Sequence, residues 1–337
     1  MRRYNPLTVD FARPAFAFLA GSATLRYQTA FFIMIPVPQK MTSVLTLMSP
    51  TIGGLTTTLV EQAADQLRQM GATVGDPVWL SESEACDILF SRLETRSCEM
   101  ALRSTFAGTR LDMALQPVDG RRKKLLLADM DSTIVTSETL DELADYAGLK
   151  QQISAITERA MNGEILFRDA LTERVAMLKG LDADTLARTM ERITYTPGAG
   201  TLVRTMSANG AYTALASGGF RYFTGRVRDA LGFDFEIGND IGIEDGRFTG
   251  EVQGDIVTKA VKRETLIMLA DQQGIDISET MAVGDGANDL PMITTAGTGV
   301  AYHAHKVVVD SAPFRIDHAG LEALLFMQGY RRAEFVI

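Results

Sequence analysis

The feature that most constrains the fold is an apolar run, Leu125–Ala128, followed directly by two aspartates, Asp129 and Asp131. A short uninterrupted apolar run is typical of a strand buried on both faces of a parallel sheet. Two carboxylates about 4 Å apart repel each other by roughly 4 kcal/mol at an effective dielectric constant near 20. Because a cation or a shared proton relieves such repulsion, the run predicts a buried strand that brings two acids to a site.

The same alternation continues after this strand. Apolar runs at Tyr212–Ala216, Thr280–Val283 and Gly299–Ala301 are separated by segments with helical periodicity. This order predicts an α/β fold with a doubly wound, mostly parallel, Rossmann-like sheet. Ligands of such sheets bind beyond the carboxyl ends of the strands, so the residues that follow each strand are the candidates for chemistry.

Polar segments follow the second and third strands as well. The segment "SGGF" (217–220) follows the second, and "GDGAND" (284–289) follows the third. A helix that carries Lys259 and Lys262 lies between them. An Asp-x-Asp or Gly-Gly pair alone usually marks a solvated turn. The four segments in this order instead predict that acids, a hydroxyl group and a cation meet at one edge of the sheet.

These segments resemble the four motifs of the haloacid dehalogenase-like phosphotransferases, with "DMDST" as the first, "ASGGF" as the second, a helix lysine as the third and "GDGAND" as the fourth. The resemblance covers about 200 residues, from 125 onward. Within that superfamily, "DMDSTIVTSETLDELA" and "AMNGEILFRDALTERVAMLKGL" resemble the phosphoserine phosphatase family. The resemblance implies hydrolysis of O-phospho-L-serine to L-serine and phosphate, the last step of serine biosynthesis. A phosphatase or phosphotransferase for another small phosphorylated hydroxy compound, such as phosphohomoserine, is the alternative.

The resemblance also implies a role for each matching residue. Asp129 would be the nucleophile that forms an aspartyl-phosphate, and Asp131 would protonate the leaving hydroxyl and then activate water. Mg²⁺ prefers oxygen ligands, and it would be held by Asp129, the Asp131 backbone carbonyl and Asp285, supported by Asp289. The phosphate would be bound by four residues: Ser217, Gly218, Lys262 and Asn288. Lys259 is the alternative to Lys262.

The segment between the first two motifs predicts a small helical cap at about residues 138–200. It has helical periodicity and is too long for a plain crossover. Thr139 and Glu142 fit a capping box that would begin the first cap helix, just after Glu138. In a later helix Arg174 falls on an otherwise apolar stripe with Leu171. An arginine that extends from a helix edge toward water is the alternative interpretation.

The cap is where the resemblance places substrate recognition. Arg174 would bind the carboxylate of phosphoserine, since an arginine can hold a carboxylate with two hydrogen bonds. Glu138 would pair with the ammonium group. Met161 and Phe167 match the apolar cap residues that exclude water when the cap closes over the site.

Two further regions precede the phosphatase-like part, which we assign to residues 119–337. Residues 41–118 show a βαββαβ order, which predicts a ferredoxin-like α+β domain that resembles the ACT-type regulatory domains. This implies an amino-acid effector, and a contact surface for a homodimer is the alternative. Residues 1–40 are an N-terminal extension, for which we weigh a true start at Met41 against a targeting segment.

Composition narrows the classes of function. The net charge of −9 disfavours a nucleic-acid partner, and no apolar run reaches the roughly 18 residues that a membrane span needs. Two cysteines, Cys86 and Cys98, cannot build a disulfide framework and indicate a reducing, cytoplasmic compartment. "GDGAND" could be a dinucleotide loop, but Asp289 at its third glycine position would repel a pyrophosphate. A ligand-sensing regulator without activity is disfavoured because every catalytic position is present.

Overall fold

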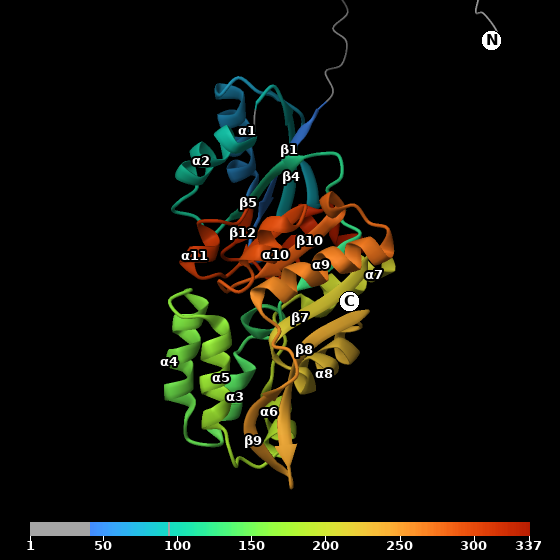
Figure 1. Ribbon diagram of the computed structural model, residues 1–337. Helices are drawn as coiled ribbons and strands as arrows, with labels where there is room; N and C mark the ends of the chain where they lie inside the picture. The colour runs from blue at the N-terminus through green and yellow to red at the C-terminus, as the bar shows by residue number, and fades with distance from the viewer. Residues whose placement is uncertain (1–40, 94) are drawn as a thin grey trace, which may run out of the picture. The chain divides into compact units, whose positions relative to one another are not determined.

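The computed structural model describes residues 41–93 and 95–337, which Figure 1 shows as a ribbon. The extension predicted for residues 1–40 lies outside this part of the chain. The described residues form two sheets, one with five strands and one with seven. No helix among them is both long enough and apolar enough to cross a membrane.

The five-stranded sheet is antiparallel, with the order β2-β4-β1-β5 and with β3 paired to β4 beside β2. Its strands and helices are β1 (Ser43–Met48), α1 (Thr57–Gln69), β2 (Thr73–Val74), β3 (Val78–Ser81), β4 (Ala85–Ser91), α2 (Thr95–Thr105) and β5 (Asp112–Pro117). The order confirms the predicted ferredoxin-like α+β fold. Leu45 and Leu47 of β1 share a core with Val60 of α1 and Leu102 of α2, because alternate residues of a strand face the same side. Cys86 and Cys98 are both buried in this core.

The seven-stranded sheet has the order β12-β11-β10-β6-β7-β8-β9. Its strands are β6 (Leu125–Ala128), β7 (Tyr212–Phe220), β8 (Phe235–Glu244), β9 (Arg247–Gln253), β10 (Thr280–Gly284), β11 (Thr298–Tyr302) and β12 (Phe314–Ile316). All neighbouring pairs are parallel except β8 and β9, which form a hairpin. Asp245 and Gly246 at its tip have φ values of 48° and 73°, as a type I′ turn requires. The fold is therefore the mostly parallel α/β sheet that the sequence predicts.

Helices cover both faces of this sheet. They are α7 (Ala199–Ala208), α8 (Arg221–Leu231), α9 (Lys259–Gln273), α10 (Leu290–Thr295), α11 (Lys306–Val309) and α12 (Ala323–Met327). Leu125 and Leu127 of β6 share a core with α9 and α10, whereas Leu126 and Ala128 share one with α7, α8 and α12. The run "LLLA" is apolar throughout because both faces of its strand are buried.

Four cap helices lie between β6 and β7. They are α3 (Thr139–Asp145), α4 (Lys150–Met161), α5 (Phe167–Met177) and α6 (Thr185–Arg192). Helices α3, α4 and α5 lie side by side in Figure 1 and pack on one another. Helix α5 also packs on β9 of the hairpin, which gives the hairpin a structural role in supporting the cap.

Apolar and polar contacts join the first sheet to the second part of the chain. Met48 and Ala114 on the sheet face away from α1 and α2 share a core with Phe326 of α12. Arg121 donates from Nη1 to Asp87 Oδ2 over 2.6 Å and from Nε to the carbonyl oxygen of Met327 over 3.0 Å. One face of the antiparallel sheet is therefore buried against the second part of the chain.

Candidate active site

The end of β6 places the first two acids. The Asp129 N–H still donates to the carbonyl of Val283 on β10 over 3.0 Å, so the strand pairing fixes its position. The chain then turns through η1 (Met130–Ile134), where Ser132 has a φ of 56°. After this turn Asp131 Oδ1 accepts the N–H of Thr139 over 2.7 Å, and Oδ2 accepts Ser217 Oγ–H over 2.8 Å. Both acids are buried, as expected for functional side chains at the end of a central strand.

This hydrogen bond overturns one expectation. We predict Thr139 as the N-cap of a capping box with Glu142, but helix α3 begins at Thr139 itself, and Glu138 takes the N-cap position, where its side chain makes no capping hydrogen bond. The Thr139 N–H is bonded to Asp131, and Glu142 instead pairs with Lys150 and Arg192. A tertiary contact to the acid therefore replaces the local cap.

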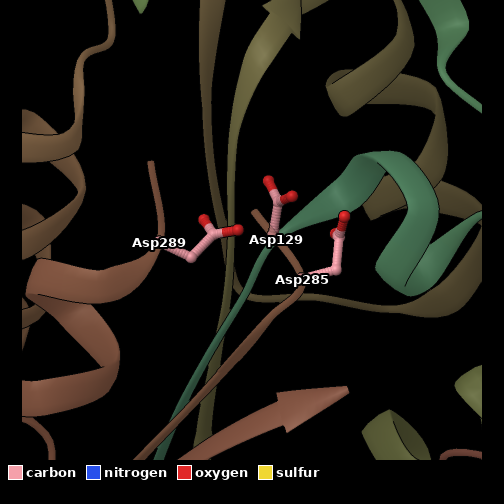
Figure 2. A group of neighbouring side chains, drawn as sticks. All are labelled: Asp129, Asp285 and Asp289. Atoms are coloured by element: carbon pink, nitrogen blue, oxygen red, sulfur yellow. The ribbon is translucent and has the colours of Figure 1, made fainter. Parts of the chain in front are cut away.

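The loop after β10 adds two more acids to Asp129. Asp129, Asp285 and Asp289 are all buried, and one carboxylate oxygen from each lies within 4.8 Å of the others. Figure 2 shows the three side chains around a common space. Thr133 donates to Asp285 Oδ1 over 2.9 Å, and the Gly286 N–H donates to Asp289 Oδ2 over 3.1 Å. The arrangement brings the predicted Asp285 and Asp289 to the predicted nucleophile.

Lys262 lies within this group of acids, whereas Lys259 on the same helix is exposed. Its ammonium donates to Asp129 Oδ1 over 2.5 Å and to Asp289 Oδ1 over 2.7 Å. Burial opposes the charged form, but the two carboxylates outweigh it and raise the pKa of Lys262. An ammonium has three N–H donors, so one remains for a further acceptor.

One lysine does not balance three carboxylates. Burial and the charge of Asp289 raise the pKa of Asp129 to about 8, and burial with Asp129 raises that of Asp285 well above its ordinary value. In addition, the side-chain oxygen of Asn288 is buried without a hydrogen-bond partner. Excess negative charge and oxygen donors are the conditions under which a protein binds a hard metal ion. The residues present therefore fit a metal.

The end of β7 supplies the hydroxyl and the flexible backbone. The strand extends to Phe220, past the predicted end at Ala216, with an irregular register over the Ser217–Gly219 segment. Ser217 Oγ accepts the Gly219 N–H over 2.7 Å. A Cβ atom at Gly218 would lie 2.2 Å from Phe167 Cζ. Only glycine fits at 218 while the ring of Phe167 covers it.

Eight predicted residues line one cavity between the cap and the sheet: Asp129, Asp131, Glu138, Met161, Phe167, Arg174, Gly218 and Asn288. The other four contact this group from beneath: Ser217, Lys262, Asp285 and Asp289. The space open to water centres is about 20 Å³, enough for about one water molecule. The cavity is therefore closed around its polar groups.

The cap supplies two opposite charges to this cavity. Arg174 is 3% exposed and donates from Nη1 to Thr157 Oγ1 over 2.7 Å. Glu138 Oε1 accepts Ser132 Oγ–H over 2.8 Å, and burial with the charge of Asp131 raises its pKa to about 8. No ion pair joins Glu138 to Arg174. Arg174 does not extend to water, so the alternative interpretation of a snorkelling side chain is wrong.

Sequence patterns did not indicate several residues that hold the site. Asn239 on β8 donates from Nδ2 to the Gly218 carbonyl over 2.7 Å and accepts the Val257 N–H over 2.8 Å. Thr133 lies in the first motif, "DMDST", but the motif alone does not predict its hydrogen bond to Asp285. No spacing rule marks such partners, because they act across the sheet on residues far away in sequence.

Comparisons with known proteins agree with this geometry. The model of the haloacid dehalogenase-like hydrolase family matches residues 126–294. The phosphoserine phosphatase of Archaeoglobus fulgidus is 45% identical over 216 residues, which are 64% of this chain and 63% of that protein. The Streptococcus thermophilus phosphoserine phosphatase is 44% identical over 59% of this chain and 93% of its own length. The chain spans 62% of the Streptomyces coelicolor phosphoserine phosphatase, at 37% identity over 74% of this chain.

Solved structures show the same similarity. A haloacid dehalogenase family hydrolase from Salmonella enterica serovar Typhi superposes with a TM-score of 0.74 at 31% identity, over 86% of this chain and 98% of that one. A substrate-bound phosphoserine phosphatase has a TM-score of 0.59 at 36% identity, over 61% of this chain and 98% of its own.

Proposed function

Because the chain belongs to the haloacid dehalogenase-like hydrolase family, we propose that it is a phosphoserine phosphatase that releases L-serine and phosphate from O-phospho-L-serine. One observation carries the choice of substrate. A single closed cavity contains the Asp129 carboxylate together with a cation, Arg174, and an acid, Glu138. Phosphoserine presents a phosphate, a carboxylate and an ammonium group. The carboxylate complements Arg174 and the ammonium group complements Glu138, while the phosphate would lie beside Asp129 as the group that it attacks.

Asp129 is the nucleophile of the proposed reaction. Its carboxylate oxygen forms a bond to phosphorus while the bond from phosphorus to the serine oxygen breaks. Asp131 gives its proton to the departing oxygen, so serine leaves as a neutral hydroxyl compound. The Thr139 N–H holds the Asp131 carboxyl group in place for this transfer.

The second step regenerates the enzyme. Asp131 takes a proton from a water molecule, whose oxygen attacks phosphorus as the bond from phosphorus to Asp129 breaks. Inorganic phosphate leaves with the new oxygen. The small closed cavity keeps bulk water away until this step.

The phosphate needs positive charge and donors in both steps. Lys262 has one N–H that is not used by Asp129 or Asp289. With the Gly218 backbone, the Asn288 amide and the Ser217 hydroxyl, whose proton would turn from Asp131 to the phosphate, it would hold the phosphate oxygens. Mg²⁺ would be held by Asp129, Asp285 and the Asp131 carbonyl with support from Asp289, and it would neutralise phosphate charge.

The experiment that tests this function is a substrate panel. Phosphate release is measured with phosphoserine, phosphohomoserine and 4-nitrophenyl phosphate, each with Mg²⁺ and with EDTA. We expect the highest kcat/KM with phosphoserine and loss of activity in EDTA. A higher kcat/KM with phosphohomoserine, or activity that is unchanged in EDTA, would contradict the proposal.

Residues 41–118 would bind an amino-acid effector in this proposal. Their sheet reaches the catalytic part through Asp112, whose carboxylate accepts the backbone N–H groups of residues 317–319 over 2.7 to 3.0 Å. We expect L-serine to inhibit with a noncompetitive component that Asp112→Asn reduces. If L-serine inhibits both the wild type and Asp112→Asn purely competitively, the effector proposal is contradicted. Residues 41–118 would then form dimer contacts, which sedimentation would detect.

A further inference from the structure

Arg174 is fixed by the cap before any substrate arrives. Its Nη1 donates to Thr157 Oγ1 over 2.7 Å, and its Nε donates to the Ala170 carbonyl over 3.2 Å. Within residues 41–93 and 95–337, no hydrogen bond uses its Nη2 group. Since Arg174 lines the cavity, the Nη2 donors and the second Nη1 donor are available to a ligand there.

Thr157 holds this arginine from the neighbouring helix α4. It is 4% exposed, and its hydroxyl has one proton to donate. As Oγ1 accepts from Arg174, that proton goes either to Asp141 Oδ1 at 2.8 Å or to the Ile153 carbonyl at 3.1 Å. The bond to Asp141 is shorter, and a carboxylate is the stronger acceptor, so we assign the proton to Asp141.

Asp141 completes a chain of contacts through three cap helices. It lies on α3, Thr157 on α4 and Arg174 on α5. Asp141 is 8% exposed, and the Ser154 side chain also bonds to it. Neither Asp141 nor Thr157 lines the cavity, so neither contacts a substrate there directly, and Arg174 is the residue that connects them to it.

We propose that Thr157 and Asp141 are positioning residues that set the specificity of the site for a substrate with a carboxylate. They hold the guanidinium in one orientation, which reduces the ordering that substrate binding must supply. This inference rests on the proposed function, because it takes the carboxylate of phosphoserine as the ligand of Arg174. It predicts that a change at Thr157 affects phosphoserine and spares a substrate without a carboxylate.

Two substrates and three variants test the inference. Phosphoethanolamine has the phosphate and the ammonium group of phosphoserine and lacks only the carboxylate. Thr157→Val removes the hydroxyl at nearly constant volume, Thr157→Ser keeps the hydroxyl, and Asp141→Asn removes the charge. Thr172→Val is the matched control, since Thr172 is an exposed cap residue whose hydroxyl donates to the Arg168 carbonyl.

We expect Thr157→Val to raise KM for phosphoserine about tenfold, which corresponds to about 1.4 kcal/mol, with kcat nearly unchanged. KM for phosphoethanolamine should stay at the wild-type value. Thr157→Ser and Thr172→Val should behave as wild type with both substrates. Asp141→Asn should raise KM for phosphoserine by roughly threefold, because a neutral acceptor still binds the hydroxyl, only more weakly.

Several outcomes would overturn the inference. Thr157→Val could raise KM equally for both substrates, which would indicate a merely structural role, or it could leave KM unchanged for both. Thr157→Ser could be as impaired as Thr157→Val. Circular dichroism checks folding, and if Thr157→Val does not fold, an unchanged KM of Asp141→Asn for phosphoserine overturns the inference. A wild-type protein that cannot hydrolyse phosphoserine but hydrolyses other phosphomonoesters would reject the proposed function itself.

Discussion

The two sides of the cavity hold their charges differently. On the sheet side, Lys262 bonds directly to Asp129 and Asp289, and these groups sit at or beneath the ends of hydrogen-bonded strands. On the cap side, Glu138 and Arg174 are not paired with each other, and each is held by a hydroxyl group, that of Ser132 or Thr157. In the proposed function the sheet carries the reaction and the cap selects the molecule, so changes on the two sides should alter different kinetic constants.

The largest effect should come from the nucleophile. Asp129→Asn removes the attacking carboxylate, so kcat should fall by at least about 1,000-fold. Phosphate release and trapping of a phosphorylated enzyme measure this effect. Asp76→Asn, at an exposed position, is the control and should keep full activity. Hydrolysis retained by Asp129→Asn would contradict the aspartyl-phosphate route.

Lys262→Met should come next, because it leaves two buried carboxylates without their cation. We expect kcat/KM to fall about 100-fold and, without metal, the free energy of unfolding to fall by about 3 kcal/mol. Urea unfolding and phosphate release measure the two quantities. Lys259→Met on the exposed face of the same helix is the matched control. An equal loss in both variants would mean that Lys262 has no special place in the site.

Glu138→Gln tests the cap side. Loss of the ammonium partner should raise KM for phosphoserine about tenfold with a smaller change in kcat. For the analogue that lacks the amino group, 3-(phosphonooxy)propanoate, KM should not rise. The control is Glu158→Gln, at an exposed position of α4. A fall in kcat with both substrates would place Glu138 with the catalytic groups and would break the division between the two sides.

The last prediction concerns stability against pH in EDTA. Asp129 has a pKa of about 8 against 3.8 for the ordinary group, so the folded state keeps a proton that the unfolded state loses. The contribution of this proton to the free energy of unfolding is therefore fully present below about pH 4. It is lost as pH rises through about 8, by up to about 1.4 kcal/mol per pH unit for each proton. Melting temperatures should show this slope, and Asp129→Asn should reduce it, while the raised pKa values of Glu138 and Asp285 keep part of it. Saturating Mg²⁺ should raise the melting temperature more at pH 8 than at pH 6.

Much of the fold and of the sheet side of the site follows from local patterns. The bounds of β6 match the predicted strand, and three strand-end segments and one helix indicated the acids and Lys262. The three-residue strand β12 had no pattern long enough to detect. Thr139 looked like a helix cap because the spacing fits one, but its N–H is bonded to Asp131 instead.

The cap side was less predictable for a physical reason. Periodicity separates apolar from polar faces, so a polar residue such as Thr157 or Asp141 is assigned to the surface. Both can be buried because Thr157 is hydrogen-bonded to Asp141 and to Arg174. Partners on different helices cannot be predicted from local sequence spacing. The resemblance to known enzymes identified Arg174 and Glu138 but not the residues that hold them.

The closed cavity, with room for about one water molecule, has a consequence for the rate of turnover. Phosphoserine is larger than this space, so in the proposed reaction the cap must move both when the substrate binds and when serine leaves. Movements of this kind displace solvent and encounter friction. A viscous cosolvent such as sucrose should therefore slow the enzyme on its best substrate, and should have less effect on variants whose chemical step is already slow.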